Sequence, residues 1–348
     1  MPHISRAEFV RGAAGATALG LTVGPRLALA DDDCRQVIVT TWGGDYDRFL
    51  KQFVEPPLVA KGIQVLPDIT QEPQRMTKLL AERSLKKGSL DVVSFSDASM
   101  FQMYQDGVLG SLDPAKLPHL KYVLKQFANS YSVPHIFSAQ VIVYTPDHVK
   151  GVPDSYSAFW DPKYKGRVGI QRTEWVNWLQ LAAQVGGGSP SNYEPGKKLL
   201  LELKKNQPRI YPTQETLAAG IANGDVWLTP DWRARAYMWA KGGLKVESAV
   251  PKEGALPVVY RAGLAKNAPD QGCCFAYLDA MLDAKAQVDF ATNMGYVPTV
   301  SNAKLPEDLE RKIGFTEEQR AHFYPQDFRY IAKNNSQWLQ WWNQEFLA

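Results

Sequence analysis

The chain has 348 residues, which is enough for two domains of ordinary size, each with its own hydrophobic core. It carries 39 lysines and arginines against 36 aspartates and glutamates, a formal net charge of +3, and 45% of its residues are hydrophobic. A charge balance so close to neutral gives no basic surface of the kind that nucleic-acid binding requires, so we expect no nucleic-acid partner.

Residues 1–30 have the pattern of an export signal. Basic residues come early, small and apolar residues fill 12–24, and the sequence "ALA" ends at Ala30 in a form that suits signal peptidase. The segment "SRAEFVR" is also similar to a twin-arginine signal with Ala7 in place of one arginine, so Sec and Tat-like export both stay open. We expect a periplasmic protein whose mature part has no membrane span, because no later segment reaches 18 uninterrupted apolar residues.

Apolar, β-branched runs alternate with helical patterns through the first third of the mature chain. The runs at 35–42, 63–70 and 90–96 predict strands, and the segments between them predict helices. This alternation is typical of an α/β fold with a mainly parallel sheet that helices flank on both faces.

The same alternation restarts near residue 139. Further strands are expected at 139–146, 167–171, 225–231, 244–254 and 257–268, and helices at 174–185, 195–205, 271–295 and towards the C-terminus. Two such units, joined by extended segments near 140 and 256, would leave a cleft in which a ligand lies at the carboxyl ends of strands. We therefore expect one lobe of residues 31–140 with 258–302, and a second of residues 141–257 with 303–348.

The three cysteines, Cys34, Cys273 and Cys274, do not make a disulfide framework. Cys273 and Cys274 lie in "QGCCFAYLDAML", a buried helix pattern, which favours core thiols over redox or metal chemistry. Pairing of Cys34 with either of them stays open in an oxidising compartment.

No catalytic constellation can be assembled. The five histidines are scattered, and the chain has no HExxH, GxSxG, Walker A or GxGxxG in the right context. We expect no enzyme activity, no catalytic residue, no cofactor and no metal.

Several segments resemble a known family. "SYSAFWDPKYKGRVGI" (155–170), "VWLTPDWRARAYMWAKGG" (226–243), "VPKEGALPVVYRAGLAKNAP" (250–269) and "DFATNMGYVPTVSNA" (289–303) occur in the order found in family 1 extracellular solute-binding proteins of ABC importers. Among these, the spermidine/putrescine-binding proteins are the most similar. The resemblance implies a two-lobed periplasmic-binding-protein (venus flytrap) fold, and a monomer that captures a small-molecule solute and presents it to a membrane permease.

The resemblance also implies a set of ligand-binding positions at strand ends. They are Trp42 and Gly43 after the first strand, Ser96 and Asp97 after the third, Arg172 and Thr173, Trp232 and Arg233, Tyr260 and Arg261, and Tyr296. Glu174 is expected to lie out of register, and Arg235 to face solvent.

The substrate class follows from how these positions depart from the family pattern. A polyamine needs unpaired acids and aromatic faces, whereas the chain has Arg172, Arg233 and Arg261 at matched positions. Arginine forks suit carboxylates and phosphonates, so an anionic or zwitterionic solute is expected. Each arginine alone is also explained by a surface or lobe-pairing role. The alternative is a polyamine held by Asp97, Glu174 and aromatic faces, and less likely is an exported enzyme.

Overall fold

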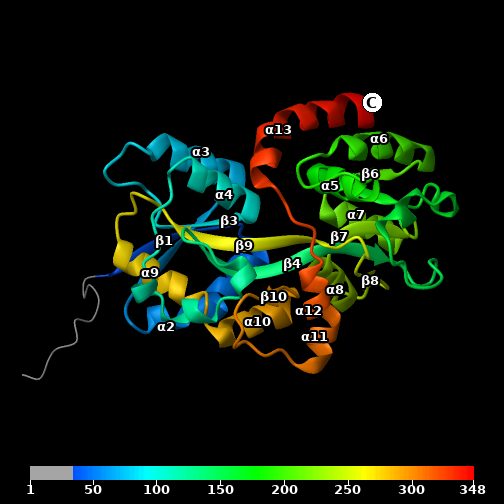
Figure 1. The fold of residues 1–348 in the computed structure, drawn as a ribbon. Helices are drawn as coiled ribbons and strands as arrows, with labels where there is room; N and C mark the ends of the chain where they lie inside the picture. The colour runs from blue at the N-terminus through cyan, green and yellow to red at the C-terminus, as the bar shows by residue number, and fades with distance from the viewer. Residues whose placement is uncertain (1–33) are drawn as a thin grey trace, which may run out of the picture. The chain divides into compact units, whose positions relative to one another are not determined.

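The computed structural model describes residues 34–348, and the export signal expected at residues 1–30 lies outside them. Figure 1 shows two groups of helices with β4 (Val133–Tyr144) and β9 (Leu256–Leu264) running between them. The described residues form one compact unit. None of their helices has the length and apolar content to cross a bilayer.

Ten strands and thirteen α-helices make up this part of the chain. The other strands are β1 (Gln36–Thr41), β2 (Gln64–Ile69), β3 (Val92–Ser96), β5 (Gly169–Gln171), β6 (Arg209–Tyr211), β7 (Leu228–Trp232), β8 (Glu247–Ala249) and β10 (Val297–Pro298). The helices are α1 (Gly44–Phe49), α2 (Pro56–Val59), α3 (Glu72–Glu82), α4 (Asp97–Gln105), α5 (Trp175–Val185), α6 (Glu194–Leu203), α7 (Gln214–Ala222), α8 (Arg233–Lys241), α9 (Gln271–Ala280), α10 (Ala284–Met294), α11 (Glu307–Ile313), α12 (Glu317–Ala321) and α13 (Phe328–Trp341).

The strands form one large mixed sheet and one small sheet. The large sheet has the order β10-β4-β9-β3-β1-β2, with β7 and β8 also paired to β4. The expected parallel pairing is found where β1 meets β2 and β3, and where β5 meets β6. The pairs that involve β4 or β9 are antiparallel, so the large sheet is mixed and the expected parallel pairing holds in it only for β1 with β2 and β3.

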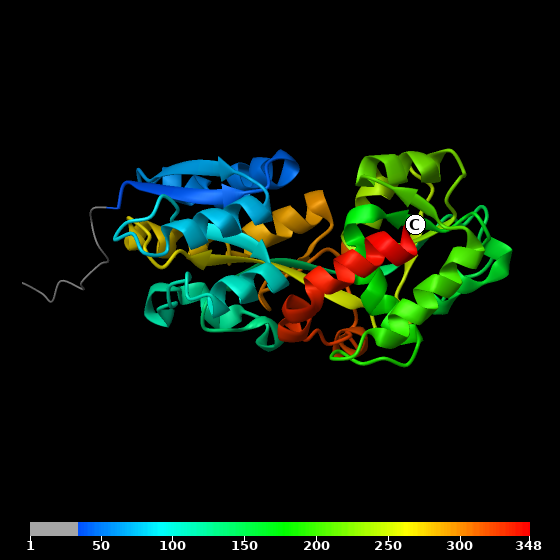
Figure 2. The ribbon, with the colours of Figure 1, turned by 90° about the horizontal axis from the view of Figure 1, so that it is seen from above.

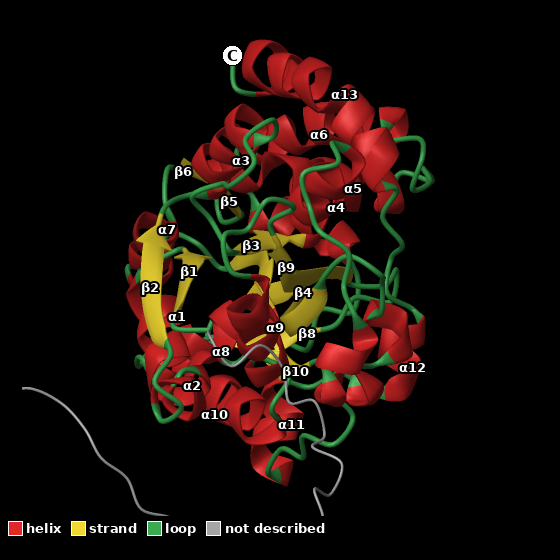
Figure 3. Ribbon diagram, turned by 90° about the vertical axis from the view of Figure 1, so that its left-hand side faces the viewer, coloured by secondary structure: helices red, strands yellow, loops and turns green. Residues whose placement is uncertain are grey.

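The first group of helices, which includes α3, α4, α9 and α10, packs on both faces of the strands β1 and β3. Successive side chains of a strand point to opposite faces, so Val92 of β3 lies in a core with α9 and α10, whereas Val93 and Phe95 pack on α3 and α4. Figure 3 shows this layering, with α3 and α4 on one side of the sheet and α2 and α10 on the other.

Several elements differ from their expected bounds. The strand expected at 244–254 is only Glu247–Ala249, and the one expected at 225–231 begins at Leu228. β4 begins at Val133, six residues before the expected start at 139, and all of its twelve residues are buried. The single helix expected at 271–295 is two helices, because the Asp283 side chain accepts a hydrogen bond from the Ala286 N–H at 2.9 Å and caps a new helix, α10.

The C-terminal helix α13 packs on the second group of helices, which includes α5 and α6. Ile331, Trp338 and Trp342 are buried in the same core as residues of α5 and α6. Figure 2 shows that α13 begins between the two groups and ends over the second.

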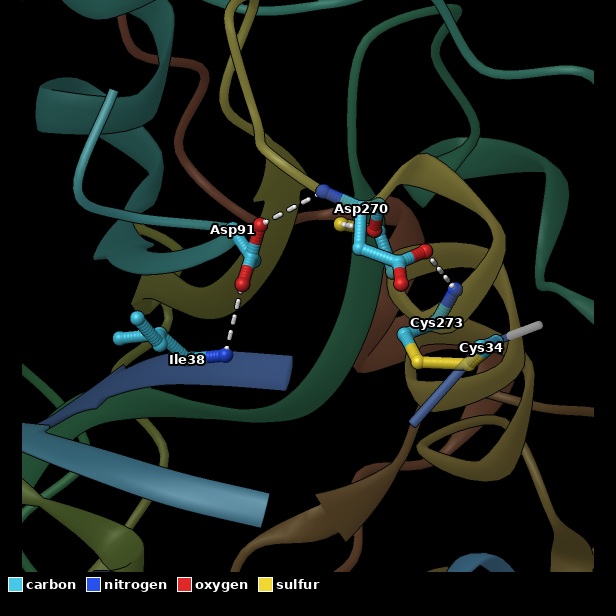
Figure 4. The surroundings of a disulfide bond; sticks show 6 residues. Cys34, Ile38, Asp91, Asp270 and Cys273 are labelled. Atoms are coloured by element: carbon cyan, nitrogen blue, oxygen red, sulfur yellow. Dashed lines mark hydrogen bonds between the residues drawn. A yellow bond between two sulfur atoms is a disulfide. The ribbon is translucent and has the colours of Figure 1, made fainter. Parts of the chain in front are cut away.

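A disulfide joins Cys34, just before β1, to Cys273 in α9 (Figure 4). The preference for core thiols is therefore wrong for Cys273 and holds for Cys274, which is buried and free. Asp270 caps α9 by accepting from the Cys273 N–H at 3.2 Å, and its carboxylate lies near both bonded sulfurs. Because the sulfurs are bonded to each other, they do not form a pair of thiolate metal ligands.

Candidate functional site

A cavity of about 270 Å³ lies where the ends of β1, β3, β7 and β9 approach α5 and the start of α13. It is lined by Trp42, Glu72, Ser96, Asp97, Ala98, Glu174, Val176, Asn177, Gln180, Trp232, Pro257, Val258, Tyr260, Gln326, Phe328 and Ile331. We call this the main cavity. Five predicted site residues are brought together in it: Trp42, Ser96, Asp97, Trp232 and Tyr260.

A smaller cavity of about 140 Å³ shares Trp42 and Tyr260 with the main cavity, and we call it the aromatic pocket. Its other lining residues are Tyr46, Ile136, Met294 and Tyr296, the last being a predicted site residue. The Trp42 and Tyr260 rings meet edge to face with centroids 5.2 Å apart. A larger surface hollow of about 510 Å³, among residues 149–164, contains none of the predicted site residues.

Gly43 determines the path of the chain after β1 and lines neither cavity. Its φ of 76° is in the left-handed region that favours glycine, and a Cβ there would lie 2.9 Å from Ile69 Cγ2. This turn takes the chain directly from the strand into α1 and leaves Trp42 at the cavity.

The three arginines expected to grip an anion are not at either cavity. Arg172 is exposed, and so is Thr173, whose hydroxyl accepts from Gln171 at 2.8 Å. Arg261 is buried and pairs with Asp97, and it also donates to the Phe127 carbonyl at 2.7 Å.

Arg233 instead closes the C-terminal end of α11. It donates to the carbonyl oxygens of Arg311 at 2.9 Å, Lys312 at 3.1 Å and Gly314, and its guanidinium lies 5.1 Å from the centroid of the Phe315 ring. Arginine near the last carbonyls of a helix is a favourable arrangement. The anion hypothesis therefore lacks the arginines that it requires.

The main cavity contains acids that the sequence alignment placed elsewhere or missed. Glu72 accepts from the Ser96 N–H at 2.8 Å and from the Ser96 hydroxyl at 2.9 Å. Glu174, expected out of register, lines the cavity, because the 3₁₀ turn Arg172–Glu174 turns its third residue inward.

Glu174 and Asp231 are close enough to influence each other. Burial, then the nearby Asp231 carboxylate, raises the pKa of Glu174 to about 7. Burial raises the pKa of Asp231 to about 6, against the opposing effect of Arg235. One Asp231 oxygen accepts from the Trp232 N–H at 2.7 Å. Two carboxyl groups are thus held in a poorly solvated place.

Several buried acceptors at this wall have no donor among residues 34–348. They are Asp231 Oδ2, Gln180 Oε1 and Gln140 Oε1. Gln180 lines the main cavity, and Gln140 lies opposite Trp232 in the β4–β7 register. A buried acceptor without a donor costs about 1–3 kcal/mol, and of these three residues only Gln180 lines the main cavity.

Arg235 does not simply face solvent as expected. It is half-buried in the first turn of α8, and its charge lowers the pKa values of Glu174, Asp231 and Tyr296 against the stronger effect of burial. Within the described part of the chain it makes no ion pair.

The sequence analysis also missed the C-terminal wall of the cavity. Gln326 donates to the Pro257 carbonyl at 2.7 Å, and Phe328 packs with its ring centroid 6.0 Å from that of Phe101 in α4. Both residues lie far along the chain from the strand ends, and no local pattern marks them as site residues.

A large antiparallel crossing between two α/β groups, with an aromatic and acidic cavity at the strand ends, defines a solute-binding protein. Residues 58–317 match the family described as bacterial extracellular solute-binding protein, and the chain belongs to that family. These are binding proteins and not enzymes.

Curated relatives and solved structures agree with this assignment. The chain is 27% identical over 269 residues to the putrescine/agmatine-binding protein of Pseudomonas aeruginosa, covering 68% of this chain and 70% of the relative. It is 25% identical over 311 residues to the spermidine/putrescine-binding periplasmic protein of Escherichia coli, covering 84% of each. The structure of the spermidine/putrescine ABC transporter substrate-binding protein of Streptococcus pneumoniae matches with a TM-score of 0.74 at 20% identity, covering 88% of this chain and 98% of that one. That likeness shows the fold.

Proposed function

We propose that this solute-binding protein captures a cationic organic amine in the main cavity and delivers it to the membrane permease of an ABC importer. The observation that carries the proposal is Glu174, a carboxyl group that lines the main cavity and lies near a second carboxyl group, the buried Asp231. An ammonium group against Glu174 would supply hydrogen-bond donors and a compensating positive charge.

The remaining lining fits the same ligand class. Trp42, Trp232 and Tyr260 offer aromatic rings in the same cavity. Aromatic faces attract cations. The names of the relatives, which include putrescine, agmatine and spermidine, also support an amine. They favour the polyamine alternative over the anion hypothesis.

We propose that the mature protein acts as a periplasmic monomer and closes on its ligand. The two lobes, 31–140 with 258–302 and 141–257 with 303–348, would move about β4 and β9, the strands that connect them. Ligand contacts from both lobes would favour the closed state. Small-angle scattering with and without a bound amine would test this, and an unchanged radius of gyration would contradict it.

Isothermal titration calorimetry tests the ligand class. We expect organic amines to bind and carboxylates and phosphonates of similar size not to bind. Glu174→Gln should weaken amine binding about tenfold or more, since hydrogen bonds to charged groups contribute about 1.5–3 kcal/mol. Glu317→Gln removes the same charge at an exposed position of α12 and serves as the control. Binding of an anion with no response to any amine would refute the proposal.

A further inference from the structure

The acids on the two sides of the main cavity differ in how they are neutralised. On the side of β3 and α4, Asp97 is ion-paired with Arg261, and the side chains of both are largely buried. An incoming ammonium group would have to compete with a charge that is already in place. Asp97 therefore offers little to a cationic ligand.

Glu72 on the same side also has a cation nearby. Arg75, one turn along α3, is 1% exposed and lies with its guanidinium 4.4 Å from the centroid of the Trp42 ring. Burial lowers the pKa of Arg75 to about 10, against the opposing effect of Glu72, so Arg75 keeps its positive charge at neutral pH. The formal charges on this side, two negative from Glu72 and Asp97 and two positive from Arg75 and Arg261, sum to zero.

The opposite side keeps an excess of negative charge when its carboxyl groups are ionised. Glu174 and Asp231 face Arg235 alone, and no ion pair is formed among these three in the described structure. Two carboxylates against one guanidinium leave one uncompensated charge. The charge balance around the cavity therefore suits one cationic group, bound beside Glu174.

The aromatic pocket next to it has no charged lining residue in the described chain. The Tyr46 hydroxyl is already hydrogen-bonded to His135 Nδ1 at 2.9 Å, and burial lowers the pKa of His135 to about 3, so the ring is neutral. The Tyr260 and Tyr296 rings meet at 5.6 Å. A second ammonium placed here would lose its water without gaining a carboxylate, whereas an apolar group would be well accommodated.

We infer that the preferred ligand carries a single amine beside Glu174 and an apolar or aromatic body that enters the pocket formed by Trp42, Tyr260, Met294 and Tyr296. This inference rests on the proposed function and narrows it. A protein that selects a linear diamine would differ from this one, because it needs an unpaired acid near each of the two ammonium groups of the ligand.

Calorimetry with matched amines tests the inference. Hexylamine and 1,5-diaminopentane have the same number of non-hydrogen atoms and differ in one terminal group. We expect hexylamine and phenethylamine to bind at least tenfold more tightly than 1,5-diaminopentane. Equal or tighter binding of the diamine would overturn the inference and leave the proposed amine function intact. Binding of none of the three, together with binding of an anion, would overturn both.

A variant of the pocket gives an independent test. Met294→Glu adds a carboxylate to the aromatic pocket and should reduce or reverse the preference for hexylamine over 1,5-diaminopentane. Met294→Gln controls for polarity without charge. Thermal unfolding of both variants reports whether they fold. If folded Met294→Glu binds both amines with the wild-type ratio, the pocket does not hold the ligand body and the inference fails.

Discussion

Replacing Cys34 by serine opens the disulfide that ties the start of β1 to α9. The two cysteines are 239 positions apart, so the closed loop contains most of the chain. In the chain-entropy description, a loop of this length stabilises the folded state by about 5.5 kcal/mol at 25 °C, because the cross-link restricts the unfolded chain. β1 lies between β3 and the edge strand β2, so loosening its start also weakens this end of the large sheet.

The assay is urea unfolding followed by tryptophan fluorescence, with and without reductant. We expect the free energy of unfolding to fall by several kcal/mol in Cys34→Ser, and the reduced wild-type protein to match it. Cys274→Ala removes a buried thiol that is not in the bond, and it should keep the sensitivity to reductant. Equal unfolding midpoints for oxidised wild type and Cys34→Ser would refute the reasoning.

Three further predictions concern the site and its supports. Arg233→Ala should lower stability by about 1–3 kcal/mol in thermal or urea unfolding, since the last carbonyls of α11 lose a charged donor, and it should leave amine affinity unchanged. Arg172→Ala should change neither, and a loss of binding in either variant would revive the anion hypothesis. The pKa values of Asp231 and Glu174 are raised to about 6 and about 7, so the folded state binds more protons than the unfolded state between about pH 4 and 7. The stability of the free protein should therefore fall as pH rises through this range. Amine affinity should rise over the same range, and calorimetry in two buffers should detect proton release on binding. An affinity that is flat over this range would contradict the assignment of these acids to the ligand. Gly43→Ala should cost about 1–2 kcal/mol in the same unfolding assay because its backbone is left-handed, and an unchanged midpoint would show that the turn after β1 tolerates a side chain.

Much of the fold follows from periodicity in the sequence. The apolar runs at 35–42, 63–70 and 90–96 correspond to β1, β2 and β3 within one or two residues, because buried strands need continuous apolar side chains. The early start of β4 was hidden by the polar residues in "VPHIFS". The break between α9 and α10 depends on one capping aspartate, a signal that is present in the sequence but was outweighed by the apolar pattern on either side.

The candidate site was predictable only where backbone position determines it. Trp42, Trp232 and Tyr260 lie at strand ends, and the resemblance to the family was enough to place them at the cavity. The arginines could not be placed in this way, because a long side chain can turn towards any nearby acceptor. Arg233 turns towards the carbonyls of α11 and Arg261 towards Asp97, and both partners come from distant parts of the chain.

Because the C-terminal residues form one wall of the main cavity, the cavity is completed late in synthesis. Gln326 and Phe328 complete a cavity whose other walls come from residues 42 to 260. During synthesis, the cavity can therefore form only after almost the whole chain has emerged, and Cys273 must also emerge before it can pair with Cys34. A chain that has not yet reached residue 328 holds no complete cavity.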